Sequence, residues 1–170
     1  MESEKYATMP DFMPNLRKIV PWYALAALVV VLDQVSKAAI MGAFPLGEGM
    51  AVTGFFNLVF VFNRGAAFSF LANAGGWQLW FFSMLALGIS GYIGQLLPKH
   101  VDNKPLCAAL SLVMGGAIGN VIDRLSYGAV VDFLDVHVAG WHWPAFNVAD
   151  SAICIGVGLL VWLQLRENKK

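Results

Sequence analysis

The sequence predicts an all-α membrane bundle of four transmembrane helices with a small extracytoplasmic β-sheet. Of the 170 residues, 58% are hydrophobic and only 13% are charged, whereas soluble domains are about 45–50% apolar and about 25% charged. No charged residue occurs between Gly65 and Pro98. Since about 20 apolar residues in a helix span a hydrocarbon core of roughly 30 Å, such segments predict helices that cross a membrane.

Four segments are long and apolar enough to be spans, and a chain of 170 residues holds them in a single domain over residues 1–170. The second is the clearest because it carries no charge. The first resembles a cleaved signal peptide, but Asp33 and Lys37 lie within it, so we expect a retained span. The predicted spans cover about residues 19–40, 77–97, 105–122 and 148–165.

The basic residues predict the orientation of the spans. Eight of the eleven Lys and Arg residues precede the first span, lie between the second and third, or follow the fourth. Because Lys and Arg gather in cytoplasmic segments, both termini are expected inside the cell. The two long connections, residues 41–76 and 125–147, are then expected outside.

Both outer connections contain a stretch typical of a β-strand. Residues 51–62 and 129–138 are rich in β-branched and aromatic side chains. A small sheet on the membrane surface would satisfy the backbone hydrogen bonds of these apolar stretches. We therefore expect a strand at each of the two.

Charge and cysteine content exclude several classes of function. The formal net charge is zero, and no basic patch of the kind that binds nucleic acid stands out. Cys107 and Cys154 belong to no Cys-x-x-Cys pair, so neither a disulfide framework nor a thiolate-bound metal is expected. Since the sequence has no internal repeats, an inverted-repeat transporter gains no support.

Ionisable residues in or beside membrane spans are costly and therefore mark candidate sites. Asp150 begins the fourth span, where the helix dipole alone would also explain a first-turn acid. Asp132 lies among β-branched and aromatic neighbours, where a surface-facing strand position is the simpler explanation. Together they indicate two carboxyls at the outer membrane boundary.

Two carboxyls brought close together share a proton, because both cannot ionise cheaply. Such a pair can hydrolyse an amide: one carboxylate takes a proton from the attacking water, and its protonated partner donates to the developing oxyanion. The spacing in the sequence allows either Asp123 or Asp132 to be the partner of Asp150.

Other chemistries fit the sequence less well. Ser36 and Lys37 are adjacent on a helix and point about 100° apart, unlike a Ser/Lys dyad. His137 and His142 form no H-E-x-x-H string and are expected to be interfacial side chains, not metal ligands. No G-x-S-x-G string is present. A small proton-coupled transporter and a non-enzymatic scaffold are the alternatives from other classes.

Further polar residues have spacings that bring them together. Asn120 and Arg124 are four apart, so they share a helix face on which they would bind a peptide backbone or form a helix-end network. Asp33 and Lys37 have the spacing and order of a helical ion pair, which would fix the end of the first span.

At these positions the chain resembles the lipoprotein signal peptidases, also called signal peptidase II. The resemblance covers roughly residues 20–165 and includes the four-span arrangement. The strings that carry it, in the family's order, are Asp33-Gln34-Val35-Ser36-Lys37, Asn63-x-Gly65-Ala66-Ala67-Phe68, Gly119-Asn120-x-x-Asp123-Arg124, Val130-Val131-Asp132-Phe133 and Phe146-Asn147-x-Ala149-Asp150.

The resemblance implies an aspartic endopeptidase of the bacterial inner membrane that removes the signal peptide from prolipoproteins. The implied cut is on the amino side of a cysteine that carries a diacylglyceryl group. Asp132 and Asp150 are the implied catalytic pair, so the resemblance selects Asp132 over Asp123. It implies no metal and no cofactor. The expected partners are the diacylglyceryl prolipoprotein and membrane lipid, without nucleic acid, and we expect a monomer.

The resemblance also implies supporting roles. Residues expected to hold the substrate backbone and the dyad are Asn63, Gly65, Asn120, Arg124 and Asn147. Residues expected to hold the structure are Asp33, Lys37 and Asp123. A sheet-like cradle on the outer face, with a mobile segment over the site, is implied as well.

Overall fold

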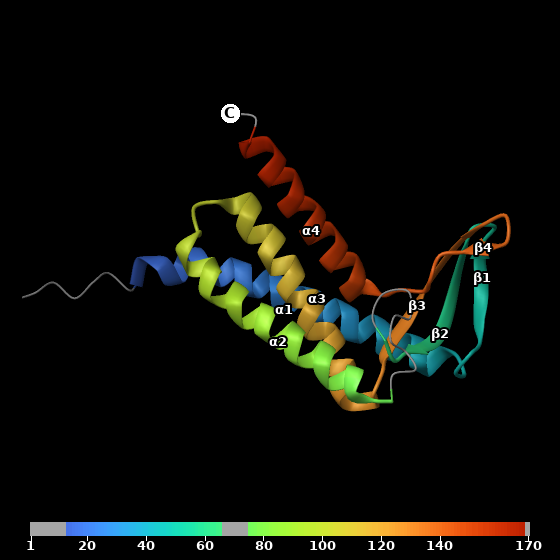
Figure 1. Cartoon of the computed structure of the whole chain (residues 1–170). Helices are drawn as coiled ribbons and strands as arrows, with labels where there is room; N and C mark the ends of the chain where they lie inside the picture. Colours follow the sequence, from blue (N-terminus) through green and yellow to red (C-terminus); the bar gives the residue numbers. More distant parts are fainter. Residues whose placement is uncertain (1–12, 66–74, 169–170) are drawn as a thin grey trace, which may run out of the picture.

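The computed structural model describes residues 13–65 and 75–168 (Figure 1). The helices are α1 (Met13–Ala43), α2 (Trp77–Leu96), the short 3₁₀ helix η2 (Leu97–Lys99), α3 (Lys104–Tyr127) and α4 (Val148–Glu167). The strands are β1 (Gly49–Thr53), β2 (Phe56–Asn63), β3 (Val130–Val138) and β4 (Trp141–His142). Within the described residues, four helices are long and apolar enough to cross a membrane, which confirms the predicted fold class.

Helix α3 extends beyond the third predicted span because local capping signals, not hydropathy, end a helix. It begins after Asn103, whose side chain accepts a backbone N–H of the first turn. It ends before Gly128, which takes a φ of 72° and donates its N–H to the carbonyl of Arg124. The extra turn puts Asp123 and Arg124 on the helix, so the directions of their side chains are fixed.

Helix α3 is the central helix of the bundle (Figure 1). In its most apolar stretch 61% of residues are buried, against 28% in α1 and 17% in each of α2 and α4. Two glycines let its neighbours approach closely. A Cβ at Gly115 would meet the carbonyl oxygen of Ala26 in α1, and one at Gly116 would meet that of Ala149 in α4. The other three helices expose apolar side chains that suit a lipid environment.

The strands form one antiparallel sheet in the order β1-β2-β3-β4. The strand expected at 129–138 is confirmed by β3. The stretch 51–62 is not one strand but two, because the chain turns at Gly54 and Phe55 and returns as β2. Here the N–H of Phe55 donates to the hydroxyl of Thr53 at 3.3 Å.

Strand β4 was not expected from the sequence, since it has only two residues. It pairs with the end of β3 through a turn at Ala139 and Gly140, whose φ angles are 50° and 82°. Positive φ at both central residues is the pattern of a type I′ hairpin, which matches the twist of the strands.

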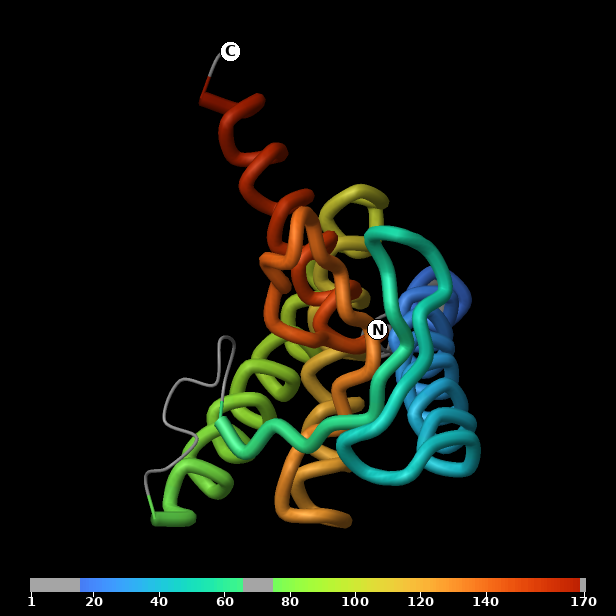
Figure 2. Tube along the Cα trace, turned by 90° about the vertical axis from the view of Figure 1, so that its right-hand side faces the viewer, coloured from blue at the N-terminus to red at the C-terminus, as the bar shows by residue number. Residues whose placement is uncertain are grey.

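The sheet lies at one end of the helix bundle, opposite the end where α1 begins and α4 finishes (Figures 1 and 2). A buried apolar cluster joins the two parts: Ile40 of α1 packs with Phe60, Val131 and Phe133 of the sheet. This junction fixes β3 against the helices and so positions the polar residues described next.

Candidate active site

Polar side chains from several elements meet where the sheet joins the bundle. Asp132 lies in β3, where it pairs with Val61 of β2. Asp150 lies in the first turn of α4, whose N-cap is Asn147. Asn120 projects from α3 into the same junction. The tertiary structure therefore brings together residues from distant parts of the chain.

Two asparagine amides connect the carboxyls of Asp132 and Asp150. The NH₂ group of Asn147 donates to Asp132 Oδ1 at 2.8 Å and lies 3.2 Å from Asn120 Oδ1. The NH₂ group of Asn120 donates to Asp150 Oδ1 at 2.7 Å. Asn63 donates to the second oxygen of Asp132 at 3.0 Å. The two carboxyls are thus part of one hydrogen-bonded network.

Asp132 is only 2% exposed. Burial, followed by the charge of Asp150, raises the pKa of Asp132 from 3.8 to about 7. The amide hydrogen bonds from Asn63 and Asn147 act in the opposite direction and limit the rise in this pKa. A carboxyl with this pKa can hold or release a proton near neutral pH.

A cavity of about 660 Å³ opens beside these carboxyls. Its polar end is lined by Asn63, Gly65, Asn120, Arg124, Asp132 and Asp150. The rest of its wall is mostly apolar and comes from α2, α3 and α4, from Val130 of β3, and from residues 143–146 between β4 and α4. Arg124 lies over the ring of Phe82 at 5.5 Å and donates to the carbonyl of Gly65 at 3.3 Å. The cavity thus combines an acidic, hydrogen-bonding end with an apolar groove.

Asp33, Lys37 and Asp123 form a buried ion triad behind the carboxyls. The ammonium of Lys37 lies 2.8 Å from Asp33 Oδ2 and 2.8 Å from Asp123 Oδ2. Asp123 also accepts the N–H of Val131 and the amide of Gln34. The oxygens of Asp123 are engaged in these contacts, whereas Asp132 joins the hydrogen-bonded network with Asp150.

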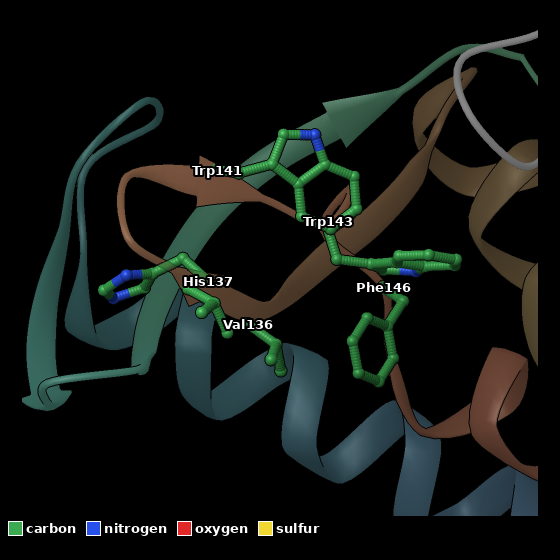
Figure 3. A pocket seen from close by; sticks show the side chains of 6 residues that line it. Val136, His137, Trp141, Trp143 and Phe146 are labelled. Atoms are coloured by element: carbon green, nitrogen blue, oxygen red, sulfur yellow. The ribbon is translucent and has the colours of Figure 1, made fainter.

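A second, apolar hollow of about 310 Å³ lies on the sheet near the β3–β4 turn (Figure 3). Trp141, Trp143 and Phe146 surround it, and the His137 ring lies at the end away from Trp143 (Figure 3). Trp143 and Phe146 line the larger cavity as well. These two side chains are therefore a wall shared by the two hollows.

His137 and His142 stack across β3 and β4 with ring centroids 4.7 Å apart. His142 Nδ1 is 2.8 Å from Asp135 Oδ1, and Asn57 donates to the other oxygen at 2.7 Å. Burial raises the pKa of Asp135, but these hydrogen bonds outweigh it and leave that pKa below the ordinary value. The histidines thus form part of a polar cluster on the sheet.

Comparison with known proteins identifies the family. The family model described as signal peptidase (SPase) II matches residues 25–166. The chain belongs to the signal peptidase II family. This confirms the resemblance seen in the sequence and makes the chain a protease, in place of the transporter and scaffold alternatives.

Relatives in the signal peptidase II family match along nearly all of their length. The chain is 57% identical to a lipoprotein signal peptidase of Janthinobacterium sp. (strain Marseille), over 96% of this chain and 99% of the relative. It is 56% identical to one of Ralstonia nicotianae, over 88% of this chain and 87% of the relative. A solved bacterial membrane enzyme shares 34% identity and a TM-score of 0.79, covering 88% of this chain and 92% of that one.

Membership of the signal peptidase II family, together with the four long apolar helices, makes the chain a multi-pass protein of the bacterial inner membrane. The predicted residues Asn63, Asn120, Asn147 and Arg124 all lie around the two carboxyls. Ala66, Ala67 and Phe68, which complete one of the family strings, lie outside the described residues.

Two polar residues that hold buried carboxyls were assigned no role from the sequence. Gln34 donates to Asp123 at 2.8 Å and to the carbonyl of Gly119 at 3.2 Å, so it links α1 to α3. Asn57 holds Asp135 in the sheet. For Gln34, the presence of a polar residue inside a membrane span could have indicated a role. Asn57 had no such signal, because polar residues are ordinary in outer connections.

Proposed function

We propose that this protease is an aspartic endopeptidase that removes the signal peptide from diacylglyceryl-modified prolipoproteins. The bond cut lies on the amino side of the lipid-bearing cysteine. The observation that carries the proposal is the placement of Asp132 and Asp150 in one amide network at the wall of an apolar cavity.

The proposed reaction needs one ionised and one protonated carboxyl. The ionised member takes a proton from a water molecule, whose oxygen attacks the scissile carbonyl, while the protonated member donates to the carbonyl oxygen. Collapse of the tetrahedral intermediate breaks the C–N bond, and the leaving nitrogen takes a proton from the dyad. The products are the carboxylate of the signal peptide and the free amine of the lipid-bearing cysteine.

The cavity supports a lipid-modified substrate. Its apolar wall includes Phe82, Leu85 and Ile89 of α2 and Ile153 of α4. Acyl chains in the bilayer are held there by about 0.8 kcal/mol per buried CH₂. The lipid-bearing cysteine therefore reaches the dyad by diffusion in the membrane plane, with its acyl chains along the apolar wall and the peptide at the polar end.

The proposal includes an orientation in which the dyad lies at the outer face of the membrane and both termini are cytoplasmic. The start of α1, the turn between α2 and α3, and the end of α4 lie away from the sheet (Figure 1). Described basic residues at that end include Arg17, Lys18, Lys99, Lys104 and Arg166. Because Lys and Arg favour the cytoplasmic side, the sheet and the dyad belong outside.

The test is cleavage of a diacylglyceryl prolipoprotein by purified Asp132→Asn and Asp150→Asn variants. Both are expected to fold, to bind substrate and to cleave nothing, because an amide neither shares the proton nor accepts one from water. Asp102→Asn is the matched control, since Asp102 is an exposed acid that forms a surface ion pair with Lys18, and it should cleave normally. Full cleavage by either dyad variant would overturn the proposal.

A further inference from the structure

Three asparagine amides face the two carboxyls, and each presents its NH₂ group. Asn63 and Asn147 donate to Asp132 at 3.0 and 2.8 Å, and Asn120 donates to Asp150 at 2.7 Å. An amide turned by 180° would present its oxygen instead and would repel an ionised carboxylate. The orientation of each amide is therefore a requirement of the site, and something must set it.

Local backbone sets two of these orientations. The oxygen of Asn63 accepts the N–H of Gly65 at 2.9 Å, and that of Asn147 accepts the N–H of Asp150 at 2.8 Å. A backbone N–H can only donate, so it must face an oxygen. Both donors lie within three residues of the asparagine that they hold, so the chain orients these two amides by itself.

Asn120 is oriented by a partner from another helix. Its oxygen lies 3.0 Å from the ammonium of Lys37 in α1, and 3.2 Å from the NH₂ group of Asn147. The Asn147 group also faces Val131 and Asp132, so its two hydrogens are divided among three acceptors. Lys37 is thus the charged donor that holds the oxygen of Asn120.

The direction of the Lys37 ammonium is itself fixed. The side chain is 1% exposed, and an ammonium has three donors and no acceptor. Its three acceptors are Asp33 at 2.8 Å, Asp123 at 2.8 Å and Asn120 at 3.0 Å. Two of its hydrogens face the two carboxylates, so the remaining hydrogen points at Asn120.

We propose that Lys37 is a positioning residue of the dyad, which acts by holding the Asn120 amide so that its NH₂ group faces Asp150. The inference rests on the proposed function, since it gives Lys37 a role in that reaction beyond holding the fold. Loss of the ammonium frees Asn120 to turn its oxygen toward Asp150, which disfavours the ionised form of that carboxyl.

The two acids of the triad extend this role to the backbone. Asp33 accepts the N–H of Ala149 at 2.9 Å, next in the chain to Asp150. Asp123 accepts the N–H of Val131 at 3.0 Å, next in the chain to Asp132. One buried ion triad therefore holds the segment of each dyad residue, and Lys37 couples the two acids.

The test separates positioning from folding by a charge-matched variant. Lys37→Met alone leaves two buried carboxylates without a cation and is expected to unfold readily. In Lys37→Met with Asp123→Asn, the triad keeps its net charge of −1, since one positive and one negative charge are removed together. The readouts are kcat and KM for a diacylglyceryl prolipoprotein, their pH profile, and thermal stability in detergent.

We expect the charge-matched variant to fold, to keep its KM, and to lose on the order of 100-fold in kcat, as small misplacements of catalytic groups do. The KM is retained because Lys37 is not among the described residues that line the cavity. The pH profile of kcat should shift as well, since Asp150 loses an N–H donor. Lys18→Met, an exposed lysine of the same helix, is the control and should behave as the parent.

A second measurement assigns the effect to Asn120. In an Asn120→Ala background, Lys37→Met with Asp123→Asn should cost little further kcat, because residues that act through one another are not additive. Equal losses in both backgrounds, or a parental kcat in the charge-matched variant, would overturn the inference. If Asp132→Asn is inactive but the charge-matched variant is fully active, the proposed function is retained and only the positioning role of Lys37 is rejected.

Discussion

Two aspartates nine residues apart in the chain, Asp123 and Asp132, have opposite environments although both are buried. Asp123 contacts the ammonium of Lys37 and a backbone N–H, which compensate its charge. Within residues 13–65 and 75–168, the side-chain hydrogen bonds to Asp132 come from neutral amides, and a second carboxyl, Asp150, lies near it. A cation at hydrogen-bonding distance therefore distinguishes the environment of Asp123 from that of Asp132 and, under the proposed function, suits Asp132 for exchanging a proton.

The raised pKa of Asp132 predicts how stability depends on pH. Between about pH 4 and 7 the folded chain holds a proton on Asp132 that the unfolded chain releases, so stability should fall as the pH rises through this window. Thermal unfolding in detergent between pH 4 and 8 measures this slope. Asp132→Asn should lose that part of the slope, because an amide does not titrate. A variant with an unchanged slope would show that Asp132 ionises normally.

At the scale of elements, the dyad depends on how closely α3 and α4 approach. Gly116 of α3 lies against the carbonyl of Ala149 and the side chain of Ile153. Because Ala149 precedes Asp150, any displacement at this contact moves the start of α4 and with it the carboxyl. The glycines of α3 therefore contribute to the site by allowing the backbones of the helices to approach closely, and not by any reactive group of their own.

Gly116→Ala should destabilise the fold by about 1–3 kcal/mol, since a methyl group is forced into a filled contact. It should also lower kcat, because the displaced α4 carries Asp150. Gly88→Ala is the matched control: it lies in α2, and a Cβ there meets nothing within 4 Å. Removing a helix glycine in open space is expected to be neutral or to stabilise by about 0.5–1 kcal/mol. Equal thermal unfolding of the two variants would contradict this packing argument.

At the scale of the whole molecule, the separation of basic helix ends from the sheet predicts the topology. The probes are two variants that each carry one cysteine, Phe55→Cys in the β1–β2 turn and Asp102→Cys between η2 and α3. Both are made in a background in which Cys107 and Cys154 are replaced. An impermeant thiol reagent added to intact cells should label the cysteine at position 55 and leave the one at 102 unlabelled. The reverse pattern would place the sheet and the dyad in the cytoplasm.

The sequence by itself determined the membrane class, the four spans and the β-character of the outer connections, because hydropathy and residue type are local properties. It also marked Asp33, Lys37 and Asp150 as unusual, since ionisable groups near lipid are rare. It did not determine where the stretch 51–62 divides, because its strand-forming residues continue on both sides of the turn.

The tertiary structure decided which polar groups meet. Asp123 and Asp132 are equal candidates by spacing, and only the junction of sheet and bundle puts one beside Lys37 and the other in the network of Asp150. The partner of Asn120 lies 83 residues earlier in the chain, a distance that no local pattern bridges. Charge compensation depends on three-dimensional neighbours, so the role of each acid follows from the fold.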